Sequence, residues 1–456
     1  MEVKIMSSRI IKPLYEGNHS PITNSISLSV FDKITYDTHI AIIYAYRPPT
    51  PPNGAIEVGL QKALAVYREW AGRLGIDDNG EPAILLNDEG VKFIEAYVDS
   101  TLDQELPFKS SPSLLSFHPS WKPKVCPWVL EDGHEEKDSS EGVIELVQVQ
   151  LTRFKCGSLV VGFTAHHFVA DGNSTSNFLV AWGQACRGVE ISPLPFHDRT
   201  IFTPRNPPVF EFEHKGVEFI CKNFSKAHNF NHNSIVDNIV LHKVHYTVEF
   251  LAKLKVKASS TKGNNNIKPF STFESLLAHL WRAITKSRRL SELETTHVRI
   301  SVDGRHRLNP KVPNEYVGNL VLWAFPTTKV KTLLEEPLSY AAKLIHDAIK
   351  KVNNNYFRSF IDFANYKVKE ENLMTSADIN KDVYCPNVEV DSWLRFPFYD
   401  LDFGGGCPYI FMPSYYQAEG VMLFLPSYTG DGSIEVYIPL FEDNLATFKQ
   451  VCYNMD

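Results

Sequence analysis

The first half of the chain mixes apolar patterns of two periods, one typical of strands and one typical of helices. Short apolar runs and strict alternation of apolar and polar residues predict strands, whereas apolar side chains repeated every three or four positions predict helices. In this half they predict a strand at 40–46, a helix at 53–74, a hairpin made by 147–151 and 158–165, and a helix that is capped by Asn173 or Ser174 and ends before Gly188. The second strand of the hairpin leads directly into the sequence HHFVADG, residues 166–172.

The second half repeats this mixture after a segment that lacks either period. Residues 191–208 are rich in proline, which is typical of a surface connection between domains. Beyond it the patterns predict strands at 239–248, 297–302, 409–412, 420–425 and 434–439, and helices at 272–287 and 338–352. A chain of 456 residues exceeds the size at which one hydrophobic core stops growing. We therefore expect an α/β fold with mixed sheets, divided into an N-terminal domain at 1–195, a crossover linker at 196–220 and a C-terminal domain at 221–456.

Composition and charge narrow the class of ligand. The net charge of -7 does not indicate the basic surface that binding of nucleic acid requires. No apolar stretch is long enough for a signal peptide or a membrane-spanning helix. The seven cysteines are scattered without a CxxC pair, so we expect neither a disulfide framework nor a bound metal. The sequence thus predicts a cytoplasmic protein that acts on a small molecule.

His167 is the candidate catalytic residue. It follows an apolar strand and precedes a turn glycine and a capped helix, whereas the other HxxxD spacing, at His134 and Asp138, lies in an acidic loop. Acyl transfer from a thioester to an amine or hydroxyl needs a base that accepts the proton of the attacking group. A neutral imidazole suits that task at physiological pH. The alternative interpretation of His167 is a hydrogen-bonded core histidine.

A glycine-rich segment near the C-terminus, DFGGGCP at 402–408, is the second candidate. Consecutive glycines let a backbone approach a ligand closely or present its amides, which suits a loop that lines a CoA channel. We expect donors near this loop to stabilise an oxyanion. The alternative is a plain tight turn. Cys407 has no adjacent histidine partner, and we interpret it as a buried thiol.

The motif HHFVADG in mid-chain, together with DFGGG near the C-terminus, resembles the plant BAHD acyltransferases. The segments STFESLLAHLWR at 271–282 and DGRHRLNP…YVGN at 303–319 extend the resemblance over essentially the whole chain. The resemblance implies two chloramphenicol-acetyltransferase-like domains with a channel between them and His167 as the general base. It also implies a monomer that binds no permanent cofactor and uses acyl-CoA as a co-substrate.

The resemblance further implies structural roles for the two motifs. In this family the motif aspartate points away from the substrate and holds an arginine of the other domain, which assigns that role to Asp171, with Arg305 or Arg307 as its partner. The C-terminal loop keeps the motif residues Asp402, Gly404 and Gly406. Gly405 stands where the family normally has tryptophan, and the loss of that side chain is expected to enlarge or reshape a nearby pocket.

The variant loop, with SWLRFPFYDLDFG before it, looks most like family members that transfer hydroxycinnamoyl groups to amines such as agmatine, putrescine or tryptamine. A cationic acceptor needs a carboxylate partner when it leaves water. The candidate anchors are Asp37 beside His39, and Glu389 or Asp391 just before Trp393. Arg395 suits instead the carboxylate of a shikimate or quinate acceptor, the alternative in which the product is an ester.

The phosphates of CoA call for lysine, arginine and hydroxyl donors. The candidates, from resemblance as much as from charge, are Ser271, Thr272, Lys255, Lys257 and Lys262. We therefore expect a hydroxycinnamoyl-CoA donor and a small amine acceptor as partners, and neither nucleic acid nor a membrane. A hypothesis of a different class is a non-catalytic binding protein on the same scaffold, which the presence of His167 and Asp171 disfavours.

Overall fold

The computed structural model describes the chain in segments. They are residues 2–17, 24–106, 108, 111–119, 145–222, 238–260, 269–377 and 383–455. Three residues that the sequence analysis singled out, His134, Asp138 and Lys262, lie outside them. Among the helices of the described segments, none is long and apolar enough to cross a membrane.

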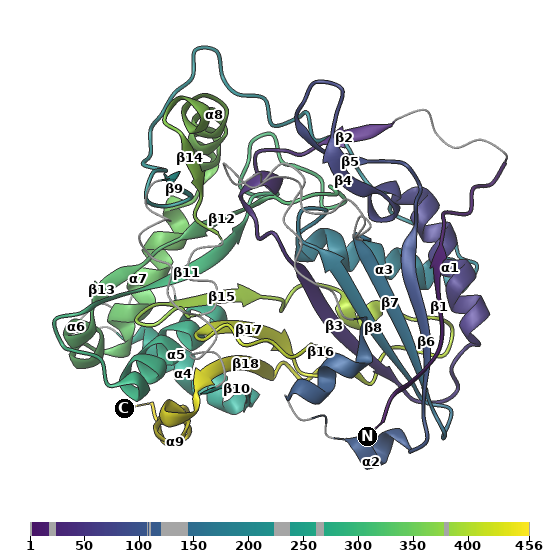
Figure 1. Ribbon diagram of the computed structural model, residues 1–456. Coiled ribbons are helices and arrows are strands. Elements are labelled where there is room, and N and C mark those ends of the chain that lie inside the picture. Colours follow the sequence, from purple (N-terminus) through teal and green to yellow (C-terminus); the bar gives the residue numbers. More distant parts are fainter. Residues whose placement is uncertain are drawn as a thin grey trace. The chain divides into compact units, whose positions relative to one another are not determined.

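The chain divides into two compact units, and each unit draws on separate stretches of the sequence. Unit 1 comprises Met1–Thr203, Val312–Leu320 and Phe396–Tyr415. Unit 2 comprises Pro204–Lys311, Val321–Arg395 and Tyr416–Asp456. Both units contain a mixed sheet accompanied by helices (Figure 1), which confirms the predicted α/β class.

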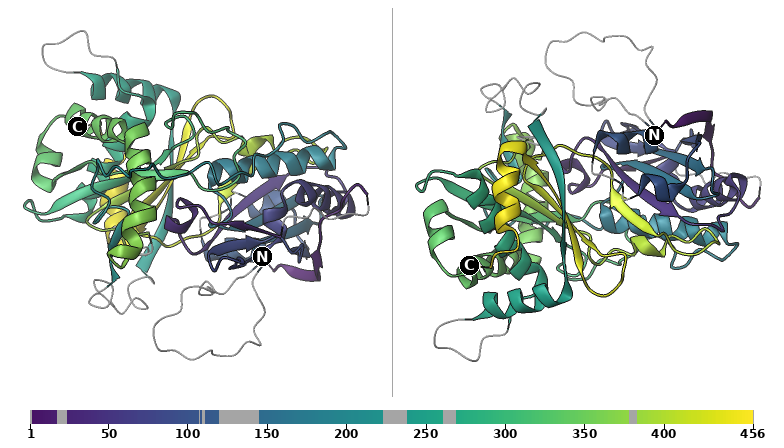
Figure 2. Two further views of the ribbon diagram at one scale, coloured as in Figure 1. Left: turned by 90° about the horizontal axis from the view of Figure 1, so that it is seen from above. Right: turned by 90° about the horizontal axis from the view of Figure 1, so that it is seen from below.

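Unit 1 is built on a six-stranded sheet with the order β1-β6-β7-β8-β3-β16, in which β6 and β7 run parallel and the other neighbours antiparallel. A small sheet has the order β2-β5-β4. The elements are β1 (Lys4–Ile11), β2 (Ser25–Ser27), β3 (His39–Tyr46), α1 (Asn53–Val66), β4 (Arg73–Ile76), β5 (Pro82–Leu85), β6 (Val91–Val98), α2 (Leu102–Glu105), β7 (Val147–Phe154), β8 (Leu159–His166), α3 (Gly172–Cys186) and β16 (Ile410–Pro413). Figure 2 shows β16 in yellow-green among the purple and teal elements of unit 1.

Both faces of the large sheet in unit 1 are covered, which explains why β8 is largely apolar and is buried along its whole length. Phe163 of β8 packs against Phe178 of α3, with ring centroids 6.0 Å apart. Because side chains alternate along a strand, Gly162 faces the other side of the sheet. There a Cβ on Gly162 would lie only 2.0 Å from Phe117 O. The end of β8 is therefore fixed from both sides.

Unit 2 contains a seven-stranded sheet with the order β10-β18-β17-β15-β11-β12, and β13 pairs with β11 off this path. Its strand β15 runs parallel to both β11 and β17. The elements are β9 (Phe219–Cys221), β10 (Ile239–Tyr246), α4 (Val248–Ser259), α5 (Thr272–Arg288), β11 (Thr295–Asp303), β12 (Val321–Ala324), β13 (Thr327–Lys329), α6 (Val330–Glu335), α7 (Leu338–Lys351), α8 (Asn354–Glu370), β14 (Leu373–Thr375), β15 (Val388–Ser392), β17 (Val421–Pro426), β18 (Ile434–Phe441) and α9 (Glu442–Val451). Helix α5 packs against α4, α7 and α9, and β14 pairs with β9.

Most predicted elements are confirmed, and two helix boundaries are corrected. The helix predicted at 53–74 ends at Val66, because the chain passes through a 3-10 turn and then pairs as β4 with β5. The helix expected to be capped by Asn173 or Ser174 begins at Gly172. Its N-cap is Asp171, whose side chain accepts a hydrogen bond from the backbone N–H of Ser174.

The two units also differ from the linear division predicted at 195 and 221. The segments Val312–Leu320 and Phe396–Tyr415, which that division gave to the C-terminal domain, lie in unit 1. The second of them supplies β16, which hydrogen-bonds to β3. Periodicity reveals a strand but not its partner, so the exchange of segments was not visible in the sequence. As a result, HHFVADG and DFGGG belong to the same unit.

Candidate functional site

His167 lies at the end of β8, where the chain turns from the sheet toward α3. Its backbone N–H donates to Thr38 O at 2.9 Å, just before β3. Its ring presents Nδ1 to two side chains, with Thr35 Oγ1 at 3.0 Å and Asn319 Oδ1 at 3.1 Å. Residues from two separate parts of the sequence therefore hold one nitrogen of this ring.

The orientation of the Asn319 amide decides which ring nitrogen of His167 carries the proton. Asn319 Nδ2 donates to Asp32 Oδ1 at 3.0 Å and to His167 O at 2.8 Å, so Oδ1 is the atom that faces the ring. Because an amide oxygen only accepts hydrogen bonds, Nδ1 of a neutral His167 donates this one. The lone pair of the imidazole then lies on Nε2, which is the state that a general base needs.

The surroundings of His167 also favour the neutral ring. Desolvation by burial is the largest influence and lowers the pKa of His167 below its usual value of 6.5, although the nearby Asp171 carboxylate opposes this effect. A histidine whose pKa is lowered is unprotonated at pH 7. The site therefore offers an imidazole that can accept a proton under physiological conditions.

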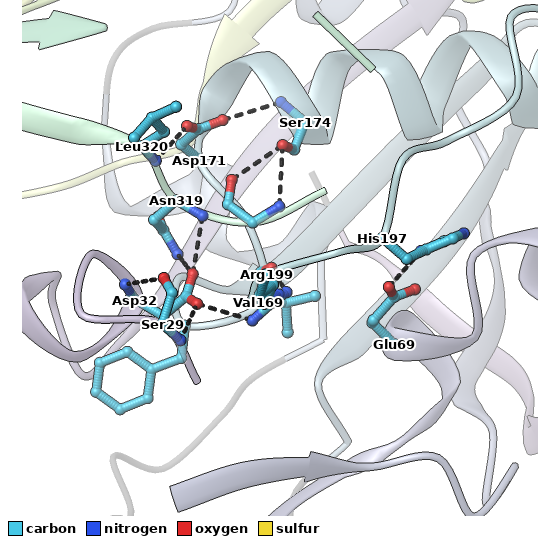
Figure 3. A network of polar contacts seen from close by, with 12 residues as sticks. Ser29, Asp32, Glu69, Val169, Asp171, Ser174, His197, Arg199, Asn319 and Leu320 are labelled. Carbon is cyan, nitrogen blue, oxygen red and sulfur yellow. Dashed lines mark hydrogen bonds and ion pairs between the residues drawn. The ribbon is translucent and has the colours of Figure 1, made fainter. Parts of the chain in front are cut away.

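Asp171 organises the segment that carries Asn319. Its Oδ1 accepts from Ser174 N at the start of α3, and its Oδ2 accepts from Leu320 N, both at 3.0 Å. Its own backbone N–H donates to Gly318 O at 3.3 Å. Figure 3 shows the carboxylate of Asp171 between Ser174, in the first turn of α3, and Leu320. Within unit 1, Asp171 thus holds the backbone on both sides of Asn319.

The arginines predicted as partners of Asp171 belong to unit 2. The side chain of Arg305 is 0% exposed and donates to Asp303 Oδ1 at 3.1 Å. Arg307 donates to backbone oxygens of Ile349 and Val352. A bond from either arginine to Asp171 would join the two units, and it stays a prediction.

Asp37 takes part in a second polar group at the end of β8. Nδ1 of His166 accepts from Phe168 N at 3.2 Å, which leaves its Nε2 to donate to Asp37 Oδ1 at 3.1 Å. His39 stacks edge-on against His166, with ring centroids 4.9 Å apart, and its Nε2 lies 3.0 Å from Glu145 O. Burial lowers the pKa of His39 to about 4, so His39 is neutral at pH 7. Asp37 is therefore the acidic member of this group.

The DFGGG loop is a tight turn built around one side chain. Asp402 Oδ1 accepts from the backbone N–H of Gly404 at 2.7 Å and of Gly406 at 2.9 Å, and both glycines have a positive φ. Arg187, the C-cap of α3, donates to Asp402 O and lies 3.5 Å from its Oδ2. The motif residues therefore shape a turn that is fastened to the C-terminal end of α3.

This placement contradicts the expected role of the loop in stabilising an oxyanion. His167 precedes α3, whereas Asp402 contacts the other end of this helix, at Gly183 and Arg187. Helix α3 spans Gly172–Cys186, and a rise of 1.5 Å per residue separates its ends by about 20 Å. An amide of the loop does not reach a carbonyl group that is attacked beside His167.

The structure bears on two further expectations about the loop, and it contradicts the one about Cys407. A Cβ on Gly405 would lie 2.1 Å from Pro49 O, so the backbone of the turn after β3 fills the space beside this residue. The absence of tryptophan therefore opens no pocket on this side of Gly405. Cys407, interpreted as a buried thiol, is exposed.

In unit 2, Glu389 and Asp391 lie on the same face of β15, two residues apart. Glu389 is 2% exposed, and its Oε2 lies 3.3 Å from Nη1 of Arg299, whose guanidinium carbon is 3.9 Å from the centre of the Trp323 ring. Asp391 accepts a hydrogen bond from Ser301 Oγ. Burial and the charge of Glu389 raise the pKa of Asp391 to about 6. This group contains two carboxylates, Glu389 and Asp391, and one arginine, Arg299. Its negative charges outnumber its positive charge, which suits the binding of a further cation.

The other predicted binding residues are also in unit 2. Trp393 is partly exposed and donates through its backbone to Phe424 O, whereas Arg395 is exposed. Lys255 and Lys257 are partly exposed on the last turns of α4, which packs against α5. Ser271 caps α5 just before Thr272 and exchanges hydrogen bonds with Glu274. The contacts of these residues with CoA or acceptor stay predictions.

The residues that hold His167 were missed by the sequence analysis. Asn319 stands in the YVGN segment, but nothing in that segment showed that its amide contacts the ring of His167. Asp32 gave a clearer signal, because it is a lone acid between apolar Phe31 and Ile34 and so had to find a partner if buried. Among the residues that the structure describes, no group of three or more His, Cys, Asp or Glu side chains could hold a metal ion.

Comparison with known proteins identifies the class to which this fold and this site belong. The family model described as "Transferase family" matches residues 1–455. Vinorine synthase shares the fold, with a TM-score of 0.69 at 21% identity, over 98% of this chain and 96% of that one. The chain belongs to this Transferase family, the BAHD acyltransferases, and it is an acyl-CoA-dependent acyltransferase.

Individual relatives cover the whole chain. Agmatine hydroxycinnamoyltransferase 1 of Oryza sativa subsp. japonica is 48% identical over 462 residues, which is 99% of this chain and 99% of the relative. Putrescine hydroxycinnamoyltransferase 3 of the same organism is 48% identical over 462 residues, with 100% of both chains covered. Shikimate O-hydroxycinnamoyltransferase of Nicotiana tabacum is 30% identical over 462 residues, again with 100% of both chains covered.

The contact at Gly405 can be tested through stability. Gly405→Ala is expected to lower the free energy of unfolding by about 1 to 3 kcal/mol, because its Cβ would collide with Pro49 O. Gly54→Ala in α1 is the matched control, since no atom lies within 4 Å of a Cβ at that position. The measurement is denaturant unfolding of both variants, and an unchanged stability of Gly405→Ala would contradict the described packing of the loop.

Proposed function

We propose that this acyltransferase moves a hydroxycinnamoyl group from CoA to a small amine such as agmatine or putrescine, with His167 as general base. The observation that carries the catalytic part is the hydrogen bond from His167 Nδ1 to Asn319 Oδ1, which leaves the lone pair on Nε2. The acceptor class is supported by the relatives at 48% identity, whose names specify agmatine and putrescine, against 30% for the relative named for shikimate.

The proposed reaction needs both substrates bound together and no nucleophile from the enzyme. As the amine nitrogen attacks the thioester carbonyl, a C–N bond forms and Nε2 of His167 takes the N–H proton. The tetrahedral intermediate then collapses, the C–S bond breaks, and the imidazolium gives the proton to the departing thiolate of CoA. The products are an amide and free CoA, and His167 returns to its neutral state.

A diamine or agmatine presents a second cationic group that must be matched when it leaves water. Two separate sets of carboxylates suit it. In unit 1, Asp37 lies in the turn before β3, whose Thr38 O accepts the backbone N–H of His167. In unit 2, Glu389 and Asp391 together exceed the charge of Arg299. A monomeric, cytoplasmic enzyme with these two substrates as its only partners is the simplest form of the proposal.

His167→Ala is expected to lower kcat by about a thousandfold, because the variant has no group to accept the proton of the amine. The measurement is thiol release from p-coumaroyl-CoA in the presence of agmatine. Binding of p-coumaroyl-CoA to the variant, measured by calorimetry, should stay within about threefold of the wild type. Full turnover by a folded His167→Ala protein would rule out the general-base role and leave substrate positioning as the source of catalysis.

The dependence of the rate on pH should follow the titration of the acceptor amine rather than the titration of His167. The pKa of His167 is lowered, so the base is already neutral at pH 7 and its titration limits the rate only in more acidic solution. An alkyl amine titrates near pH 10, so kcat/KM for agmatine should rise about tenfold per unit between pH 7 and pH 9. Shikimate has no amine and should show no such rise. A flat profile with agmatine would contradict amine transfer.

The acceptor anchors can be separated by isosteric substitutions. Asp37→Asn and Asp391→Asn keep the hydrogen bonds from His166 and Ser301 but remove a negative charge. The variant that removes the true anchor should raise KM for agmatine and putrescine about tenfold or more. KM for tryptamine, which lacks a second cation, should be unchanged and serves as the internal control. If neither variant alters KM for agmatine, both assignments fail, and turnover of shikimate or quinate alone would favour the ester-forming alternative.

A further inference from the structure

Behind Asn319 lies an ion pair that the reaction itself does not use. Arg199 Nη1 lies 2.9 Å from Asp32 Oδ2, and the two side chains are 3% and 0% exposed. The guanidinium also donates through Nη2 to Val169 O at 2.9 Å, in the turn between His167 and α3. Figure 3 shows Arg199, Asp32 and Asn319 in one continuous network.

The two oxygens of Asp32 have different partners. Oδ2 accepts from Arg199 and from Ser29 N, the latter at 2.8 Å. Oδ1 accepts twice from Asn319, from its backbone N at 2.8 Å and from Nδ2 at 3.0 Å. Four donors thus converge on one carboxylate, which can satisfy them all only while it is ionised, because a protonated oxygen would point a hydrogen at one of the donors.

Stability alone gives a weak reason for such a pair. Burying two charges carries a large desolvation penalty, and apolar residues of similar volume often replace a buried ion pair without loss of stability. The pair has one consequence that apolar residues could not supply. By accepting from Nδ2, Asp32 turns Oδ1 of Asn319 toward His167. If the amide were reversed, its NH2 group would face Nδ1 of His167 and move the ring proton to Nε2, which would then be unable to accept a proton.

The segment that carries Arg199 is fixed at further points within unit 1. Phe196 pairs with Tyr316, and its N and O atoms bond to Glu315 O and Val317 N, each at 2.9 Å. Next to it, His197 Nδ1 lies 2.5 Å from Glu69 Oε1. The first residues of the predicted crossover linker therefore lie alongside the stretch that contains Asn319.

We propose that Asp32, held by Arg199, is a positioning residue for acyl transfer, which fixes the Asn319 amide and through it the Nδ1–H tautomer of His167. The effect on rate rests on the proposed role of His167 as general base, whereas the effect on the tautomer does not. Neither Asp32 nor Arg199 needs to touch a substrate for this role.

The test compares Asp32→Asn and Arg199→Met with Arg288→Met. Arg288 forms an equally buried ion pair with Glu419 in unit 2, with side chains 1% and 0% exposed, and it is the matched control for the structural cost of losing such a pair. Two readouts are collected on each full-length protein: kcat and KM with p-coumaroyl-CoA and agmatine, and the protonation of the His167 ring nitrogens. The second comes from long-range ¹H–¹⁵N NMR correlations of ¹⁵N-histidine protein, with His167 assigned by its loss in His167→Ala.

For Asp32→Asn and Arg199→Met we expect kcat to fall about 10- to 100-fold, with KM for p-coumaroyl-CoA changed less than about threefold, and the Nε2–H form of His167 to appear. Arg288→Met should lower stability but keep both the rate and the Nδ1–H form. Arg199→Lys, which keeps the charge, should recover most of the rate and the tautomer. If Arg199→Met does not fold, Asp32→Asn carries the test.

An unchanged tautomer in folded Asp32→Asn and Arg199→Met would overturn the inference, and so would an equal loss of rate in Arg288→Met without any change of tautomer. A changed tautomer with an unchanged rate has a different meaning. It would support the positioning of His167 by Asp32 while removing His167 from the role of base, so that the proposed mechanism would fail and the structural inference would stand.

Discussion

The hydrogen bond between His167 Nδ1 and Asn319 Oδ1 is the interaction on which the chemistry of this site depends. A neutral histidine has two tautomers of similar energy in water, and only one of them places the lone pair on Nε2. In this protein the choice is made by an amide whose own NH2 group is bound to Asp32 and to His167 O. A single bond of 3.1 Å thereby gives the imidazole the tautomer and orientation that the proposed role of base requires.

The rest of unit 1 brings these two residues together and keeps them there. His167 and Asn319 are separated by 152 positions in the sequence, yet both belong to unit 1. Asp171 connects the segment after His167 with the segment that contains Asn319, because one oxygen of its carboxylate caps α3 and the other accepts a hydrogen bond from Leu320 N. Loss of Asp171 would therefore disturb the position of Asn319 as well as the start of α3, so the motif aspartate has structural contacts within its own unit.

Much of the fold was predictable because it follows from local patterns. The alternation at 147–151 gave the hairpin, and the apolar spacing at 272–287 gave α5 almost to the residue. His167 was recognised from its place between a strand and a turn, and the resemblance to BAHD acyltransferases was confirmed. The sequence did not reveal contacts that depend on tertiary pairing: the place of Phe396–Tyr415 in unit 1, the close approach of Gly405 to Pro49 O, and the partners of the His167 ring. Periodicity carries no information about such contacts.

The most direct test of the account is a neutron crystal structure of the protein exchanged into heavy water at neutral pH, which locates the deuterium atoms on His167 and Asn319. The account predicts deuterium on Nδ1 of His167, none on Nε2, and the ND2 group of Asn319 directed at Asp32. Deuterium on Nε2 of His167, or an Asn319 amide turned the other way, would contradict it.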